Sequence, residues 1–513
     1  MVHRALFGCF LIFLLRIPSF FEPAWHTDEG SFAGVAEGIL RGRDLYSEAW
    51  ESKPPLFLYL YAGIFKVFGS GLLQLKVAAA LAAILTQFAI YLVGTKLAGP
   101  VRGLAASVVF GVLVAVPFWE GNLALSEIFS MPAATLGVLA VLARSDRHRP
   151  NADAWLALAG VLFGLAFLLR QPAVLAMPAA ALWLALDSRL TLSRLFSLAA
   201  GFALPIVVIT AAFAVFGSFF WFWDANVAYF LYYVPNGSRI TSTLMLYMFA
   251  PAAIALVTLF WLRMRGAPTP AWALPALWFA LAFVGSLLNG KDYSHYLLQI
   301  FPPLALLFVT ILPVSMPALR ITWRQPALAV AVTFAVVWYV VVNAVFFDTW
   351  GRHWTKGMPY YSHFFNYVTG QESRSAYNAY FDGRVNTTAV LDDQFEALRA
   401  EGATAYIWGE YPWVYALSGL QPYSRYVTSY YILESEERLD ELLAELAKNP
   451  PQYLIIGADA EPRPNRTPTK ERFNRVAERL RVMTAQQYEP VATAGKATVF
   501  ELISVNTADK QPR

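Results

Sequence analysis

The chain has 513 residues, of which 57% are hydrophobic and only 14% are charged, and its mean hydropathy is +0.46. This composition excludes an ordinary soluble protein and indicates a membrane protein with many spans. The net charge is +4, and the basic residues fall between apolar runs rather than on one face or in one tail, which argues against nucleic-acid binding. The single cysteine, Cys9, excludes an internal disulfide and leaves the redox compartment open.

Apolar runs long enough to cross a hydrocarbon layer of roughly 30 Å as helices recur along the first two thirds of the chain. About eleven spans are expected, at residues 5–21, 72–93, 103–119, 125–143, 154–169, 172–186, 195–216, 243–262, 271–288, 296–314 and 327–347. The first run could be the core of a signal peptide, but no small-residue cleavage site follows it, which favours an uncleaved helix. The predicted fold class is a polytopic α-helical membrane protein.

Alternate connections between these runs are the basic ones. They contain Lys96 and Arg102; Arg144, Arg147 and Arg149; Arg189 and Arg194; Arg263 and Arg265; and Arg320 and Arg324. The positive-inside rule assigns these connections and the N-terminus to the cytoplasm. We expect the membrane to be the plasma (inner) membrane. The other connections then face outside, namely 22–71, 118–126, the corner at Arg170, 217–242 and 289–295. The C-terminal residues also face outside.

Two outer segments have a structure of their own. Residues 32–40 form a short amphipathic run that is followed by Arg41-Gly42, and residues 56–68 form an apolar run that is followed by Gly69-Ser-Gly71. They predict two helices along the membrane surface, unless the second is a shallow membrane entry. Residues 217–242 are rich in aromatic side chains, as expected for rings at the headgroup level. These rings favour an anchoring role, and they could also line the mouth of a groove for a lipid tail.

The last 165 or so residues change composition, because charge rises after about Phe347. Runs typical of β-strands at 405–408, 453–457 and 497–502 alternate with helical patterns at 434–448 and 470–483. This alternation predicts a C-terminal extracytoplasmic α/β domain at 348–513, after a transmembrane domain at 1–347. We find no glycine-rich phosphate loop in it, so nothing there indicates nucleotide chemistry.

Ionisable residues collect on the predicted outer side, near the ends of spans. They are Asp28, Glu29, Glu51, Lys53, Glu127, Arg170, Asp224, Arg239, Lys291, Asp292 and His295. Such groups are costly near a membrane unless partnered or hydrated, so together they indicate a hydrated cavity that opens outward. They suit a reaction in which a carboxylate takes a proton from a hydroxyl or amine while cations stabilise a departing phosphate. Each one alone could instead be a solvated carboxylate or a cation that reaches headgroups.

The order of residues along the first outer segment carries more information. Asp28-Glu29 precedes a helical run that ends at Gly42, and Glu51-Ser-Lys-Pro-Pro precedes a second run that ends at Phe68-Gly69. This order resembles the first-loop pattern of the protein mannosyltransferase and aminoarabinose transferase family, within the GT-C superfamily of glycosyltransferases. The arginine corner, His295-Tyr296 before Pro302-Pro303, and Trp408-Gly-Glu-Tyr-Pro412 also look like family features.

The resemblance implies a GT-C fold and an inverting transfer of a hexose or pentose from a polyprenyl-phosphate carrier at the outer face. Asp28 matches the catalytic acid that serves as general base, with Glu29 as the fallback. Lys53 matches the lysine that contacts the carrier phosphate, for which a point charge is suited. Arg170 suits bidentate phosphate contact. Glu127 stands where the family places a second acid, usually Asp.

Further candidates lie in or beside the later outer connections. They are Arg239 and Lys291, from the outer ionisable residues, and Tyr296, from the family-like His295-Tyr296 pair. No cofactor is required, although some family members bind a divalent metal ion through a first-loop Glu and a later His, for which Glu51 and His295 are the matches. Two ligands make a weak metal site, which favours structural roles for both residues.

Two other classes of function stay open from the sequence. A transporter or flippase would also have many spans and an outward cavity, but transporters commonly show internal repeats, and we find none. A membrane anchor for a functional tail would not need so many spans. The acceptor is open between a protein hydroxyl, a lipid A-like lipid, a cell-wall glycan and another glycolipid.

Overall fold

The computed structural model describes residues 2–143, 152–232, 253, 256–261, 264–266, 268–288, 293–311, 357–397, 402–458 and 467–503. The predicted span at 327–347 and most of the one at 243–262 lie outside the described residues. Arg239 and Lys291 lie outside them as well. The described chain divides into two units. The first comprises Met1–Phe21, Ser52–Phe57 and Leu75–Phe364, and the second comprises Glu22–Glu51, Leu58–Gln74 and Phe365–Arg513.

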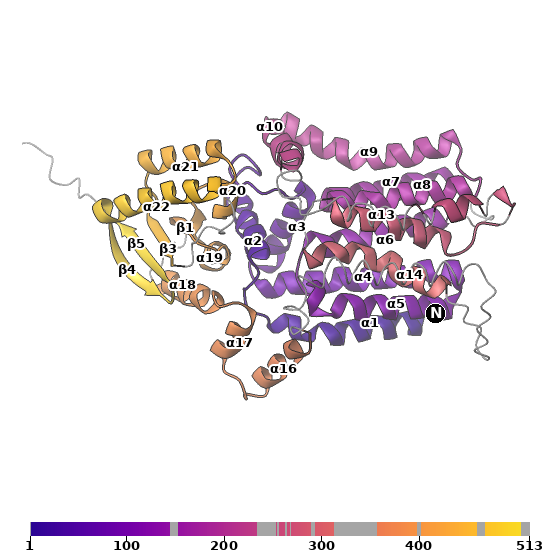
Figure 1. Cartoon of the computed structure of the whole chain (residues 1–513), viewed down its shortest axis with the longest axis horizontal. Helices are drawn as coiled ribbons and strands as arrows, with labels where there is room; N and C mark the ends of the chain where they lie inside the picture. Colours follow the sequence, from indigo (N-terminus) through magenta and orange to yellow (C-terminus); the bar gives the residue numbers. More distant parts are fainter. Residues whose placement is uncertain are drawn as a thin grey trace, which may run out of the picture. The chain divides into compact units, whose positions relative to one another are not determined.

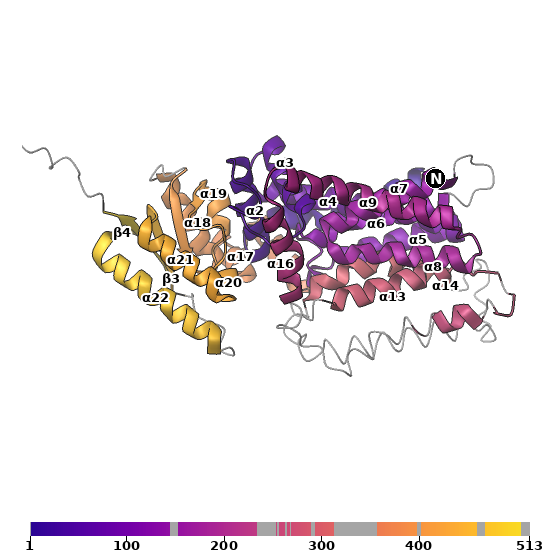
Figure 2. The same cartoon turned by 90° about the horizontal axis from the view of Figure 1, so that it is seen from above.

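The first unit is helical in the part that the structure describes. Its elements are α1 (Val2–Arg16), η1 (Ile17–Phe21), most of α4 (Leu72–Ala98), α5 (Pro100–Ala115), η2 (Pro117–Trp119), α6 (Ser126–Ala143), α7 (Ala152–Leu169), η3 (Gln171–Leu175), α8 (Ala176–Leu186), α9 (Leu192–Val215), α10 (Phe219–Trp223), the π-helical turn η4 (Asp224–Ala228), α13 (Ala273–Leu287), η5 (Ser294–Ile300), α14 (Phe301–Ile311) and most of α16 (Gly357–Val368). The long helices of this unit run side by side along a common direction in both views (Figures 1 and 2).

Every predicted span among the described residues coincides with an apolar helix. Within the residues that the structure describes, four helices are long and apolar enough to cross a membrane: Leu72–Ala98, Ser126–Ala143, Leu192–Val215 and Ser294–Ile311. Shorter apolar helices occupy Gly8–Phe21, Pro55–Phe68, Pro100–Ala115, Asp153–Leu169, Gln171–Leu186 and Ala273–Leu287. The predicted helices are therefore confirmed, while the number of membrane crossings and the orientation stay predictions.

Glycines let the backbones of α7 and α9 touch. A Cβ atom on Gly160 would lie 2.2 Å from the carbonyl oxygen of Leu198, and one on Gly201 would lie 2.1 Å from that of Ala157. No larger residue fits at either position unless the helices separate. Small residues at such contacts are how membrane helices associate closely, because lipid tails compete with any larger apolar side chain. This packing fixes α7, whose C-terminal end leads into Arg170.

The second unit combines a sheet with helices. Its helices are α2 (Thr27–Leu40), most of α3 (Pro55–Phe68), α17 (Arg374–Phe381), α18 (Val385–Ala397), α19 (Trp413–Ser418), α20 (Ser429–Leu433), α21 (Glu436–Lys448) and α22 (Thr467–Gln487). Its strands are β1 (Thr404–Trp408), β2 (Gln421–Pro422), β3 (Tyr453–Gly457), β4 (Tyr488–Ala494) and β5 (Ala497–Leu502). The three runs predicted as strands form β1, β3 and β5, and the two helical patterns form α21 and α22.

The sheet has the strand order β2-β1-β3-β5-β4. β1 pairs in parallel with β2 and β3, whereas β5 pairs antiparallel with β3 and β4. Figure 1 shows α21 and α22 along one side of the sheet and α18 along the other. Such a layered arrangement buries both faces of the central strands, which agrees with the burial of Leu454 and Ile455 in β3.

The helix α2 packs on C-terminal residues within the second unit. The indole N–H of Trp413 donates to the carbonyl of His26 at 2.9 Å, and a Cβ atom on Gly30 would lie only 2.9 Å from the backbone nitrogen of Trp413. A Cβ atom on Gly34 would meet a methyl group of Val427 at 2.9 Å. The sequence-based division placed the segment 22–71 with the membrane domain, whereas these contacts group most of it with the C-terminal residues.

Candidate functional site

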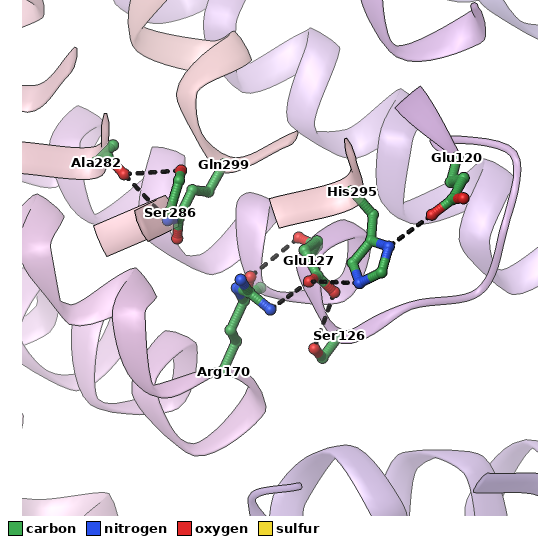
Figure 3. Close-up of polar contacts among 9 residues, drawn as sticks. Glu120, Ser126, Glu127, Arg170, Ala282, Ser286, His295 and Gln299 are labelled. Carbon is green, nitrogen blue, oxygen red and sulfur yellow. Dashed lines mark hydrogen bonds and ion pairs between the residues drawn. The ribbon is translucent and has the colours of Figure 1, made fainter. Parts of the chain in front are cut away.

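The first unit contains a buried ion pair between Arg170 and Glu127 (Figure 3). The Nη1 group of Arg170 donates to Oε1 of Glu127, and the two side chains are only 4% and 2% exposed. A buried ion pair survives only if its hydrogen bonds offset the loss of hydration of both charges. The pair therefore lies where the loss of hydration of two charges lowers the free energy of unfolding.

Local structure aims both side chains inward. α7 ends at Leu169, and Arg170 is extended, with φ −160° and ψ 117°, before η3 begins. Pro172 stands in the first turn of η3, where its missing N–H group leaves no hydrogen bond unmade. Glu127 lies in the first turn of α6, where the helix dipole favours a carboxylate, and Ser126 Oγ donates to its Oε2 at 3.0 Å.

The turn η5 places His295 and Tyr296 beside this pair (Figure 3 for His295). His295 Nε2 lies 3.9 Å from Glu127 Oε1, and its Nδ1 lies 2.5 Å from Oε2 of Glu120. The guanidinium carbon of Arg170 lies 5.0 Å from the centre of the Tyr296 ring, within the range of a cation–π contact. The turn thus contacts both members of the ion pair.

Arg170 keeps two donor atoms unused within the described structure. Its Nε and Nη2 atoms are buried and have no hydrogen-bond partner among the described residues. A buried donor without a partner costs about 1–3 kcal/mol, and more when the group is charged. Nε–H and one Nη2–H point the same way along one edge of the guanidinium plane, and such an edge matches two oxygens of a phosphate or carboxylate.

Lys53 acts on the same carboxylate. It precedes Pro54 and the start of α3, and it belongs to the first unit with Glu127. The positive charges of Arg170, His295 when protonated, and Lys53 all act electrostatically on Glu127. The structure thus brings together three of the predicted residues, Lys53, Glu127 and Arg170, and adds the predicted His295 and Tyr296.

A small cavity is lined in part by residues that closely follow Glu127 and Arg170 in the sequence. Its lining includes Ser130, Pro172 and Gln299, and its free volume of ≈ 20 Å³ is the size of about one water molecule. The side-chain amide of Gln299 donates to the carbonyl of Ala282 at 3.0 Å and to Oγ of Ser286 at 2.9 Å (Figure 3). α13 therefore holds the polar wall of this cavity in place.

The remaining predicted acids lie in the second unit. Asp28 occupies the first turn of α2 and is half-buried, whereas its neighbour Glu29 is only 1% exposed. Of the two, Asp28 can reach a substrate hydroxyl more readily. Glu51 is fully buried, and its two oxygens accept hydrogen bonds from Ser31 at 2.8 Å and from Tyr431 at 2.5 Å.

The predicted metal ligands already have protein partners. Both oxygens of Glu51 are engaged, and both ring nitrogens of His295 face carboxylates. Within the described segments, no group of three His, Cys, Asp or Glu residues is arranged to hold a metal ion. These residues do not fit a metal site, so no step below passes through a metal ion.

Glu120 is a site residue that the sequence did not single out. It lies in the predicted outer connection 118–126, and its carboxylate contacts His295. The sequence offered one signal, which is that Glu120 is an acidic residue in the same short connection as Glu127. Its partner His295 is 175 residues away, so from the sequence alone Glu120 could not be distinguished from a solvated loop carboxylate.

Residues 52–213 match the family model described as dolichyl-phosphate-mannose-protein mannosyltransferase. The matched region contains Lys53, Glu127 and Arg170. No curated protein matches the chain in a sequence search.

Among solved structures, the chain is similar to ArnT from Cupriavidus metallidurans bound to undecaprenyl phosphate. The identity is 15%, the match covers 98% of each chain, and the TM-score is 0.60. The chain is also similar to ArnT from the same organism in the apo state. The identity is 15%, the match covers 96% of this chain and 97% of ArnT, and the TM-score is 0.56. At this identity the likeness shows a shared fold, and the fold extends over nearly the whole length of both proteins.

Proposed function

We propose that the chain is an inverting glycosyltransferase of the GT-C superfamily, on the basis of the family-model match over residues 52–213 and of the fold shared with ArnT. It transfers a sugar from a polyprenyl-phosphate donor to an acceptor at the outer face of the membrane. The observation that carries the proposal is the buried Arg170, which is oriented by Glu127 and has two unused donors. Such an edge, with Lys53 acting on the same carboxylate, suits a phosphate that is negatively charged when it leaves.

The chemistry needs few groups. The acceptor oxygen or nitrogen attacks the anomeric carbon, and the bond from that carbon to the phosphate oxygen breaks. The bonding electrons leave with the polyprenyl phosphate, the acceptor proton passes to Asp28, and the anomeric configuration inverts. One general base and a stabilised leaving group are sufficient, so neither a nucleophilic side chain nor a nucleotide loop is required.

Each residue has a distinct role in this proposal. Asp28 is the base, and the buried Glu29 is the fallback. Lys53 and Arg170 bind the donor phosphate, and Glu127 orients Arg170. A lipid-linked donor agrees with the bound undecaprenyl phosphate in the ArnT structure that shares this fold. The topology proposed with it has a cytoplasmic N-terminus, an extracytoplasmic C-terminal domain and a plasma (inner) membrane location.

The test is to incubate the purified protein in lipid vesicles with polyprenyl-phosphate-linked hexoses and pentoses that carry a label in the sugar. One of these labels should be transferred to an added acceptor or released by hydrolysis. Movement of an intact donor across the vesicle, with no cleavage of any member of the panel, would instead identify a flippase.

Lys53→Ala should weaken the binding of polyprenyl phosphate by about 10- to 100-fold, since a hydrogen bond to a charged group contributes about 1.5–3 kcal/mol. Equilibrium binding of labelled polyprenyl phosphate measures the effect. Lys66→Ala is the matched control, because Lys66 is an exposed lysine in the last turn of α3. The phosphate role of Lys53 is wrong if both variants bind as tightly as the unmodified protein.

A further inference from the structure

We propose that Glu120 is a positioning residue, which holds His295 against the Glu127–Arg170 pair and so keeps the phosphate-binding edge of Arg170 in place. This inference rests on the proposed function. Three observations carry it: a left-handed backbone at Glu120, a tightly fixed loop around it, and an unbroken chain of contacts from its carboxylate to Arg170.

Glu120 has a backbone conformation that a glutamate seldom adopts. Its φ is 58° and its ψ is 23°, in the left-handed region. Glycine reaches this region without a steric penalty, whereas a residue with a Cβ atom loses free energy there. For the backbone alone, glycine would be the better residue at position 120. The glutamate therefore points to a use for its carboxylate.

The loop around Glu120 is fixed by contacts that do not involve the carboxylate. The Glu120 N–H group donates to the carbonyl of Pro117 at 2.9 Å, and Leu123 N–H donates to the Glu120 carbonyl at 3.1 Å. The buried Arg16 donates through Nη1 to the carbonyl of Gly121 at 2.6 Å. The backbone thus imposes the left-handed conformation, and the side chain is directed from a rigid base.

The carboxylate of Glu120 orients the imidazole ring of His295. The distance of 2.5 Å from Nδ1 to Oε2 assigns a proton to Nδ1, because a carboxylate accepts. The ring also stacks on Tyr293, with centroids 5.5 Å apart and planes at 7°, and it meets Tyr296 edge to face at 4.8 Å. Contacts on one edge and one face leave the ring a single orientation.

The oriented ring in turn lies next to the two residues that contact Arg170, with Nε2 at 3.9 Å from Glu127 Oε1 and the ring at 4.8 Å from that of Tyr296. Its Nε2 faces Glu127, which binds Arg170, and its neighbour Tyr296 lies under the guanidinium group. A turn of the imidazole ring would disturb both contacts of Arg170 together. Figure 3 shows Glu120, His295, Glu127 and Arg170 in this order, joined by successive dashed lines.

The test compares Glu120→Gly and Glu120→Gln in the full-length protein. Glu120→Gly removes the carboxylate and relieves the backbone, so we expect an unchanged or higher melting temperature. The same variant should bind polyprenyl phosphate at least about tenfold more weakly, since one lost hydrogen bond to a charged group costs about 1.5–3 kcal/mol. Glu120→Gln keeps an acceptor for Nδ1–H, and its affinity should lie between those of the other two proteins.

Ser188→Gly is the control for backbone relief, because Ser188 is exposed and has a φ of 53° in a different connection. It should change neither the affinity for polyprenyl phosphate nor the transfer rate. The positioning role is overturned if Glu120→Gly and Glu120→Gln bind polyprenyl phosphate as tightly as the unmodified protein, or if Glu120→Gly does not fold. Failure of the proposed function is a separate result, in which the unmodified protein itself neither binds polyprenyl phosphate nor turns over any donor.

Discussion

Asp28→Asn should abolish sugar transfer and leave both the fold and the binding of polyprenyl phosphate intact. Asparagine has the size of aspartate but cannot take the acceptor's proton. General-base catalysis contributes about 10²- to 10⁴-fold to a rate, so the single-turnover transfer rate should fall by that factor. Thermal unfolding should change little, since Asp28 is half-buried at the beginning of α2 rather than enclosed in the core.

Glu29→Gln is the matched variant for this experiment. It makes the same chemical change one residue along the helix, at a side chain that is only 1% exposed. If Asp28 is the base, Glu29→Gln should lower stability more than Asp28→Asn but retain transfer in the folded fraction. A normal transfer rate in Asp28→Asn, with loss of transfer in folded Glu29→Gln, would move the role to Glu29.

Arg170→Met should both destabilise the protein and abolish donor binding. It leaves the carboxylate of Glu127 buried without its partner, a change that typically lowers the free energy of unfolding by about 3–5 kcal/mol. It also removes the guanidinium edge proposed to bind the phosphate. Chemical denaturation in detergent measures the first effect, and equilibrium binding of polyprenyl phosphate measures the second.

The double variant Arg170→Met, Glu127→Leu separates the two effects. Replacing both members of a buried ion pair with apolar residues of similar volume is often neutral for stability. The double variant should therefore regain most of the lost stability but still fail to bind polyprenyl phosphate. Binding restored together with stability would assign Arg170 a structural role alone.

Arg189→Met is the control for loss of an arginine. Arg189 pairs with Asp187 at 2.5 Å on the surface, where its side chain is 41% exposed. Exposed pairs contribute only about 0–1 kcal/mol, because water already stabilises both charges. Stability should thus change little in this variant, and donor binding should not change at all.

Local patterns predicted the elements of this protein well. Each expected span in the described chain is a helix, because long apolar runs satisfy their backbone hydrogen bonds internally only as helices. The runs at 405–408, 453–457 and 497–502 form strands, as short runs rich in β-branched and aromatic residues favour. Each of these patterns, for a helix or for a strand, lies within the residues of the single element that it predicts.

Contacts between distant residues were beyond the reach of these patterns. Glu120 and His295 are 175 residues apart, and Glu51 and Tyr431 are 380 residues apart. The sequence named Glu51 and His295 as possible ligands of one ion, because both are polar residues at predicted outer ends. Only the packing shows that each already contacts other side chains.

The adjacent acids Asp28 and Glu29 illustrate the same limit at the shortest range. Both stand in the first turn of one helix, so no local rule distinguishes them. Their exposure differs because α2 packs through Gly30 and Gly34 on Trp413 and Val427, which turns Glu29 inward. The resemblance to a known family favoured Asp28, and the choice of Asp28 as the base stays a prediction.

The packing of α2 on the C-terminal residues also has a consequence for biosynthesis. The indole of Trp413 and the carbonyl of His26 are separated by 387 positions along the chain. A ribosome therefore completes α2 early, but the surface on which α2 packs exists only after most of the polypeptide has been made. The helix that carries Asp28 therefore reaches its final packing near the end of translation, and the base proposed above is positioned only then.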